Sequence, residues 1–168
     1  MTLISYADNL FAPAMRTADL DSVLDDIRSG RHRDMILPIR RAPASAPKEL
    51  RNALKKKLPV FAGSLFRDGI RNSTNFMEAG VIILDIDHIG DVSERALEND
   101  PYEIKGLKDD IEEYSHTDGH ICANIYSMFR SPSGDGVKVV FVLSHPLDDQ
   151  GKYKKLWSAL SSQFEEFM

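Results

Sequence analysis

The stretch that decides the fold is GVIILDIDHIG, residues 80–90. Its first half is β-branched and apolar at consecutive positions, which predicts a strand buried on both faces at the centre of a sheet. Side chains two apart on a strand point to the same side, so Asp85 and Asp87 stand together while Ile86 faces the other way. The Cβ atoms of the two aspartates are then about 7 Å apart.

Two carboxylates at this spacing, at the end of an apolar strand, repel each other and resist desolvation unless a cation or a shared proton compensates them. A divalent cation is the simplest compensation. Mg²⁺ or Mn²⁺ prefers oxygen ligands and is commonly held by one or two carboxylates together with substrate phosphates. The alternative is that the strand ends at Leu84 and leaves both aspartates solvated in a loop without metal. An apolar run followed by Asp-x-Asp also occurs in phosphatases and glycosyltransferases, so it predicts a metal site better than a reaction.

A second motif, SPSGDGVK at residues 131–138, contains residue types that contact phosphates. Its glycines and serines let the backbone turn closely and offer N–H and hydroxyl donors to an anion. The alternative is a plain hairpin turn, which favours the same residues. Lys138 favours the nucleotide site, because an unpaired ammonium between Val137 and Val139 inside a strand is costly. The candidate nucleotide-binding residues are Ser131, Ser133, Gly134, Gly136 and Lys138.

The surrounding pattern predicts α/β or α+β structure, with a mainly antiparallel sheet flanked by helices. Thr17 or Asp19 caps a helix that runs to about Ser29. A Pro-rich loop that begins at Arg40 and Arg41 leads into a second helix over about residues 47–58. LPVFAGSLF, residues 58–66, predicts a strand or strand pair that bends at Gly63.

Two β-rich runs, residues 121–129 and 137–143, predict a hairpin across the second motif. Leu107, Ile111 and Tyr114 give a short helical stripe in the acidic stretch before it. Asp148 and Asp149 have the position of an N-cap for a final helix. Its apolar stripe is expected to pack into the core and consists of Tyr153, Leu156, Trp157, Leu160 and Phe164.

Length and composition predict one globular domain, because 168 residues with 42% hydrophobic content bury one sizeable core. The chain has no apolar run of membrane-spanning length, and MTLISYADNL lacks the features of an export signal. Its single cysteine, Cys122, cannot form an internal disulfide. We therefore expect a cytoplasmic protein with no membrane partner.

Charge is segregated along the chain. Residues 31–71 hold eleven Lys or Arg against three acids, and residues 85–118 hold twelve acids against three bases. The basic stretch could face the phosphates of nucleic acid. The alternative is a solvated helix face with loops. The candidate nucleic-acid contacts are Arg40, Arg41, Lys55, Lys56, Lys57, Arg67 and Arg71.

Two other site types are weakly indicated. His116, His120 and Cys122 are unevenly spaced and include no Cys-x-x-Cys pair, which is poor support for zinc. A phosphatase would carry its Asp-x-Asp early in the domain and a small hydroxyl residue where Ile89 stands. His88 would point away from the aspartates if the strand continued, so we interpret it as structural or, at most, as a residue that supports the site without contacting the ligand.

Three blocks in order resemble the archaeo-eukaryotic primase superfamily. They are LKKKLPVFAGSLF at residues 54–66, NFMEAGVIILDID at residues 75–87 and SPSGDGVKVVF at residues 131–141. The likeness is greatest to the primase-like domain of the VirE N-terminal type, which opens many replication proteins of phages and mobile elements. It covers most of the chain, with the core motifs within residues 54–145, and it is looser before Leu54.

The resemblance implies a DNA primase or polymerase type of nucleotidyltransferase that uses Mg²⁺ or Mn²⁺. It makes Asp85 and Asp87 the metal ligands of the first motif and assigns Ser133 and Lys138 to the phosphates of the incoming nucleotide. We therefore expect the strand of Asp85 and Asp87 to lie beside the hairpin of residues 133–138. The partners it implies are nucleoside triphosphates, a single-stranded DNA template, and a helicase or other replication protein.

Two departures from the family pattern affect this expectation. Many members have histidine where this chain has Lys138, and lysine can pair with a phosphate but cannot shuttle protons near neutral pH. The family also uses a third acidic motif after the helix that follows the second motif, and we expect this motif to be missing here. The alternative function is therefore a catalytically inactive, truncated module that binds nucleic acid or a partner chain.

Overall fold

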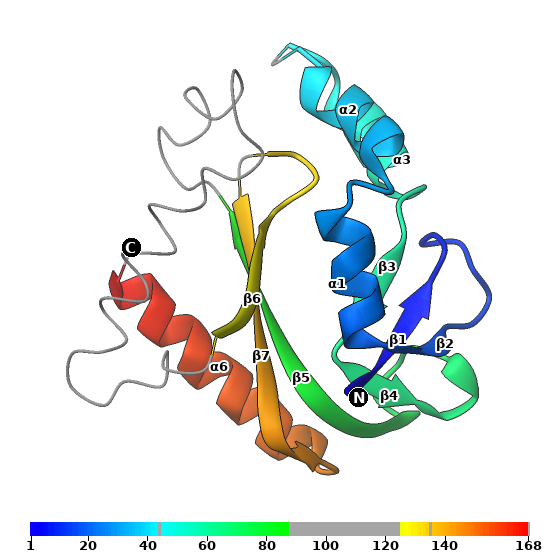
Figure 1. Ribbon diagram of the computed structural model, residues 1–168. Coiled ribbons are helices and arrows are strands. Elements are labelled where there is room, and N and C mark those ends of the chain that lie inside the picture. Colours follow the sequence, from blue (N-terminus) through cyan, green and yellow to red (C-terminus); the bar gives the residue numbers. More distant parts are fainter. Residues whose placement is uncertain (44, 88–124, 135, 168) are drawn as a thin grey trace. The chain divides into compact units, whose positions relative to one another are not determined.

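Strand β5 (Phe76–Asp87) lies inside a four-stranded sheet in the computed structural model, which describes residues 1–43, 45–87, 125–134 and 136–167 (Figure 1). The strand order is β4-β5-β7-β6. The neighbours are β4 (Ser64–Phe66), β6 (Ile125–Arg130) and β7 (Gly136–Leu147). The predicted central strand is therefore confirmed. It continues through Asp87, so the alternative in which it ends at Leu84 is wrong.

A second sheet has three antiparallel strands in the order β2-β1-β3. These are β1 (Leu3–Ala7), β2 (Arg16–Asp19) and β3 (Val60–Ala62). Together with the helices described below, the two sheets give the α+β class that the sequence predicts. Strands β1 and β2 were not predicted from the sequence, because neither short strand shows a sustained alternation of apolar and polar residues.

The chain forms two compact units, and each contains segments that are distant in sequence. Unit 1 consists of Met1–Val81 with Leu143–Tyr153, and unit 2 consists of Ile82–Val142 with Lys154–Met168. Strands β5 and β7 each pass from one unit into the other. Fully buried side chains in unit 1 include Ile4, Leu20, Leu24, Ile39 and Val81. Those in unit 2 include Ile82, Val139, Val140 and Leu160.

Gly63 separates β3 from β4 and directs the two strands into different sheets. Its carbonyl oxygen accepts a hydrogen bond from Val81 N–H at 3.3 Å. A Cβ at residue 63 would overlap the carbonyl oxygen of Val81, so two backbones approach as closely as a glycine allows. The bend that the sequence predicts at Gly63 is confirmed.

Helices α1 (Leu20–Arg28), α2 (Arg33–Arg41) and α3 (Lys48–Lys55) follow one another in unit 1. Asp19 is the N-cap residue of α1, although its side chain makes no capping hydrogen bond. The sequence analysis did not predict α2, and it assigned Arg40 and Arg41 to a loop. The structure corrects this. Pro38 lies inside α2, where its ring nitrogen cannot donate to the Asp34 carbonyl, and this removed the local signal for a helix.

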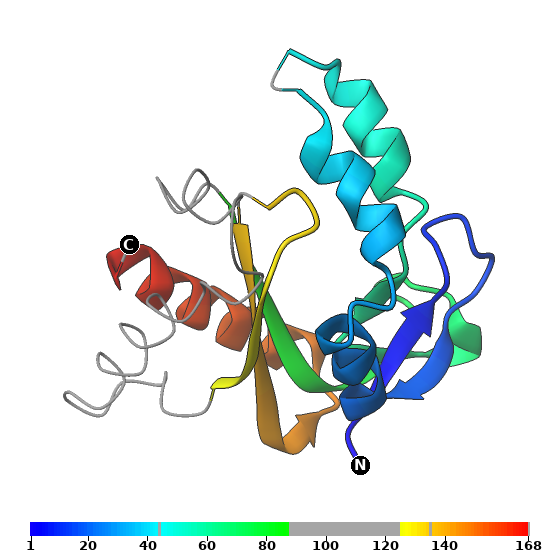
Figure 2. The same ribbon diagram turned by 45° about the horizontal axis from the view of Figure 1, so that its top comes forward.

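Packing stabilises α2 in spite of the proline. Figure 2 shows α2 and α3 lying side by side, and Ile39 on α2 is buried with 2% of its surface exposed. Helices in proteins gain most of their stability from such packing of an apolar face and little from intrinsic propensity. Tertiary contacts therefore outweigh the unfavourable proline here.

The predicted hairpin and the final helix are both confirmed. Strands β6 and β7 pair antiparallel, and residues 121–124 of the first predicted run lie outside the described residues. Helix α6 (Gln150–Phe167) follows Asp149, whose Oδ1 accepts hydrogen bonds from Gly151 N–H at 2.7 Å and Lys152 N–H at 3.0 Å. This is an N-cap as the sequence predicts.

The prediction that Trp157 packs into the core is wrong, since 40% of its surface is exposed. Its Nε1 donates to the Ile83 carbonyl oxygen at 3.2 Å, so the ring ties α6 to β5. Leu160, one turn further along α6, is 2% exposed and does belong to the core. An indole needs a partner for its N–H, and here the backbone of β5 provides one at the surface.

Several sequence predictions lie outside the described residues. They concern the helical stripe of Leu107, Ile111 and Tyr114, the roles of His88 and Ile89, and the zinc candidates His116, His120 and Cys122. The side chain of Phe164 is outside as well. Within the described part of the chain, no helix is long and apolar enough to cross a membrane.

Two tyrosines in unit 1, Tyr6 and Tyr153, have raised pKa values, and we expect them to lower the stability of the fold at alkaline pH. Burial raises the pKa of Tyr153, which packs against Phe76 with ring centroids 6.0 Å apart, and the Ser64 hydrogen bond offsets part of this rise. Burial and then Asp8 raise the pKa of Tyr6. A folded-state pKa above the ordinary 10.0 means that the unfolded chain loses its phenolic proton first.

The stabilising contribution of these phenols is therefore complete below pH 10.0 and decreases as the pH rises through the folded-state values. We expect the free energy of unfolding, measured with urea, to fall above pH 10.0, and to fall less steeply in Tyr153→Phe. A variant with the same pH slope as the wild type would show that Tyr153 is not responsible.

Candidate active site

The end of β5 and the start of β7 lie against each other in unit 2, and this brings the two sequence motifs together. A Cβ at Gly136 would lie 2.5 Å from the Ile86 carbonyl oxygen and 3.1 Å from Asp87 Oδ1. Glycine is therefore required at the first residue of β7. The close approach brings the Asp87 carboxylate next to the backbone where the loop of the second motif ends.

An ion pair joins the strands one step further along. Lys138 Nζ lies 2.5 Å from Asp85 Oδ2. Gly136 meets Ile86, whereas Lys138 reaches back to Asp85, so β5 and β7 run in opposite directions. The side chain of Lys138 is 24% exposed and that of Asp85 is 53% exposed. The contact is thus open to solvent on the Asp85 side.

Asp85 and Lys138 compensate each other's charge, so each of them has the counter-ion that the sequence argument expected it to need. The sequence argument assigned a metal to Asp85 and a phosphate to Lys138, and in this structure the two side chains instead pair directly. Asp87 is exposed and has no ion-pair partner among the described residues. Within the described residues, the Asp87 carboxylate therefore has no counter-ion.

The two carboxylates could supply some, but not all, of the oxygen ligands of a hard cation such as Mg²⁺. Asp85 and Asp87 occupy alternate positions of one strand, so their carboxylates leave β5 on the same side. Within the described ranges, no group of three or more His, Cys, Asp or Glu residues is arranged to hold a metal. Two carboxylates are enough for Mg²⁺ only where water and substrate phosphates supply the remaining ligands.

The loop between β6 and β7 is a hairpin turn closed by its own hydrogen bonds. Ser131 N–H donates to the Gly136 carbonyl at 2.7 Å, and Gly134 N–H donates to the Ser131 carbonyl at 3.0 Å. Gly134 has a φ of +86°, which glycine adopts without strain. Arg130 Nε donates to the Gly134 carbonyl at 2.7 Å, and the hydroxyl oxygens of Ser131 and Ser133 lie 3.1 Å apart.

This geometry matches the hairpin alternative for the local structure. The amides of Ser131 and Gly134 are used within the turn, so they do not present their N–H groups to a phosphate in this conformation. Within the motif, Lys138 is the cationic residue to which a phosphate could bind.

The residues predicted to contact nucleic acid belong to unit 1, whereas Asp85, Asp87 and Lys138 belong to unit 2. Arg40 and Arg41 form the last turn of α2, and Lys55 ends α3. Lys56 and Lys57 follow α3 directly. Arg67 begins the short 3₁₀ helix η1 (Arg67–Gly69), and Arg71 comes two residues after it.

Comparison with known proteins does not identify a relative. No family model, no curated protein and no solved structure matches this chain. The resemblance to the primase superfamily is therefore carried by the residues alone and stays a prediction.

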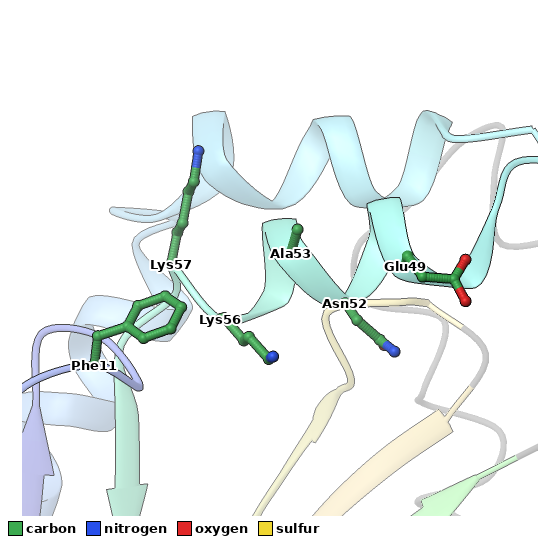
Figure 3. Close-up of a pocket in the computed structure, with 6 residues that line it drawn as sticks. All are labelled: Phe11, Glu49, Asn52, Ala53, Lys56 and Lys57. Carbon is green, nitrogen blue, oxygen red and sulfur yellow. The ribbon is translucent and has the colours of Figure 1, made fainter.

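One surface feature of unit 1 was missed at the sequence level. Phe11, in the connection between β1 and β2, is 69% exposed and lines a pocket with residues of α3 (Figure 3). Its sequence context, DNLFAPAM, contains turn-forming residues, which indicate a loop. Nothing local indicates that the loop meets α3, because that contact joins residues about 45 positions apart along the chain.

Proposed function

We propose that this chain is a metal-dependent nucleotidyltransferase domain of the primase-polymerase type, which binds a nucleoside triphosphate and a divalent metal at the β5–β7 junction. The contact between Asp85 and Lys138 supports the proposal most directly. An acidic strand and a Lys-bearing hairpin, far apart in sequence, meet within ion-pair distance, which would allow the metal and the phosphates of one nucleotide to bind side by side.

Each residue has a defined task in this proposal. Asp85 and Asp87 would hold Mg²⁺ or Mn²⁺ through carboxylate oxygens. The metal, when bound, would supply positive charge that acidifies a 3′-hydroxyl and neutralises developing charge on phosphate. Lys138 would leave Asp85 and pair with a phosphate oxygen as a point charge.

The exchange of partners by Lys138 is favourable in electrostatic terms. The metal replaces the ammonium as the counter-ion of Asp85, and the triphosphate replaces Asp85 as the counter-ion of Lys138. Neither charge is left unpaired in the complex, which avoids the cost of a desolvated single charge. The resting ion pair therefore keeps the site neutral on the Asp85 side until metal and nucleotide arrive together.

The test is calorimetric titration of the wild-type chain with Mn²⁺ and a non-hydrolysable nucleoside triphosphate, together and singly. We expect nucleotide binding only when Mn²⁺ is present. Lys138→Ala should bind Mn²⁺ alone at least as well as the wild type, because Asp85 loses its competing partner, but should bind the metal nucleotide roughly 10-fold more weakly. Lys138→Arg should restore part of the loss. A wild-type chain that binds nucleotide equally well without metal would refute the proposal.

A second function is favoured by the same ion pair. Because Lys138 already neutralises Asp85, the junction is compatible with a structural role that involves no metal. The chain would then be an inactive module that binds nucleic acid or a partner chain through the basic residues of unit 1. Absence of any metal or nucleotide binding in the titration, with oligonucleotide binding retained, would support this second function.

A further inference from the structure

Phe11 is an exposed aromatic residue whose backbone is firmly held. It lies between β1 and β2 with 69% of its surface exposed, and the adjacent Leu10 is 51% exposed. Phe11 N–H donates to Asn9 Oδ1 at 2.9 Å, and Leu10 N–H donates to the Lys56 carbonyl at 3.0 Å. The first bond fixes the turn, and the second attaches it to the end of α3. The Phe11 ring is thus presented to solvent from a defined position.

The ring forms one end of a shallow pocket of about 400 Å³ in unit 1. The residues that line it are Phe11, Glu49, Asn52, Ala53, Lys56 and Lys57. Figure 3 shows Lys56 and Lys57 toward the Phe11 end and Glu49 at the opposite end. The volume falls in the range of roughly 300–1,000 Å³ that is typical of small-ligand sites.

The charges beside the ring are available to an anion. Lys56 and Lys57 are both exposed, and neither forms an ion pair with any residue of the described chain. Glu49 is the one acid that lines the pocket, and it lies away from the ring. The Phe11 end therefore combines an aromatic face with two cations.

We infer that this pocket binds a single-stranded nucleic acid, with a base stacked on Phe11 and neighbouring phosphates on Lys56 and on Lys57, whose side chains point in different directions (Figure 3). Single strands are bound in this way on other proteins, by aromatic platforms for the bases beside cations for the backbone. Asn52 adds an amide that can meet a base edge. The inference rests on the nucleic-acid partner of the proposed function but uses none of the β5–β7 residues.

Two features favour a single strand over an apolar peptide. Phe11 and Ala53 are the apolar residues that line the pocket, too few to bury a row of peptide side chains. A lone exposed Phe is ordinary on a protein surface. Here, however, backbone hydrogen bonds hold it beside two lysines, which can contact the phosphates on either side of a stacked base.

The test is fluorescence anisotropy with a labelled thymidine oligonucleotide, in the absence of metal and nucleoside triphosphate. We expect Phe11→Ala to weaken binding roughly 5- to 100-fold and Phe11→Trp to preserve it. Lys56→Ala with Lys57→Ala should lower the salt dependence, reducing the slope of log affinity against log salt by about 1 to 2. Leu50→Ala, at a 50% exposed residue of the same helix, and Lys48→Ala are matched controls and should bind as the wild type does.

Three results would overturn the inference. They are equal binding by Phe11→Ala and wild type, equal binding of an abasic oligonucleotide and the normal one, and displacement of the oligonucleotide by polyglutamate at equal charge concentration. The last result would indicate an acidic peptide as the ligand. Because the assay contains no metal, Asp85→Asn with Asp87→Asn should bind the oligonucleotide normally, so failure here and failure of the proposed active site are distinguishable.

Discussion

Replacing Asp85 and Asp87 together by asparagine is expected to abolish Mn²⁺-dependent nucleotide binding, with a loss of more than about 100-fold in affinity. Loss of a partner that only orients a metal ligand already costs about 10- to 100-fold in metal affinity, and this variant loses both carboxylate ligands. Asparagine keeps the shape of the side chain and one oxygen. The measurement is calorimetric titration of Mn²⁺ with a non-hydrolysable nucleoside triphosphate.

The fold should withstand this change. Asp85 is half exposed, so its pairing with Lys138 contributes about 1 kcal/mol or less. Asp148→Asn changes an exposed aspartate that belongs to neither β5 nor β7 in the same way and should leave binding intact. Full nucleotide binding by the double variant would exclude these carboxylates as ligands. Unfolding of the variant would instead indicate that they have a structural role.

Gly63→Ala is expected to lower the free energy of unfolding by about 3 kcal/mol. The new methyl group would overlap the Val81 carbonyl oxygen, which is backbone and cannot turn aside as a side chain does. Relief requires β3 or β4 to move away from β5, which weakens the hydrogen bond from Val81 N–H to Gly63. Urea unfolding followed by circular dichroism measures the effect.

Gly80→Ala provides the matched control on β5. A Cβ at Gly80 meets no atom within 4 Å, so the same methyl group is added one residue from Val81 without a clash. This variant should be as stable as the wild type or slightly more so, because alanine restricts the unfolded chain. If the two alanine variants were equally stable, the close approach at Gly63 would not be what the fold depends on.

The sequence was most informative where a signal was local and strong. Continuous β-branched residues predicted β5, and the turn residues at 131–135 predicted the β6–β7 hairpin. The Asp85 and Lys138 motifs were expected side by side, and their adjacency follows from the pairing of two strands that the sequence had identified. What binds there is a matter of chemistry that the fold does not decide.

The failures have physical causes as well. Helix α2 contains Pro38, so its stability comes from packing and not from propensity. Trp157 lies on the apolar stripe of α6, yet its ring is exposed and its N–H donates a hydrogen bond to the Ile83 carbonyl oxygen. The pocket lined by Phe11 and Lys56 depends on a contact between a loop and a helix that is distant in sequence, and hydrophobic periodicity does not predict such contacts.

The division of the chain into interleaved units has a consequence during synthesis on the ribosome. Unit 1 needs residues 143–153, which are made long after residues 1–81, and the segment between them belongs to unit 2. The nascent N-terminal part therefore cannot finish its own unit before most of the chain has emerged. We expect both units to fold late and at the same chain length when synthesis is stalled at successive positions on the ribosome. Domains that are contiguous in sequence fold one after another instead.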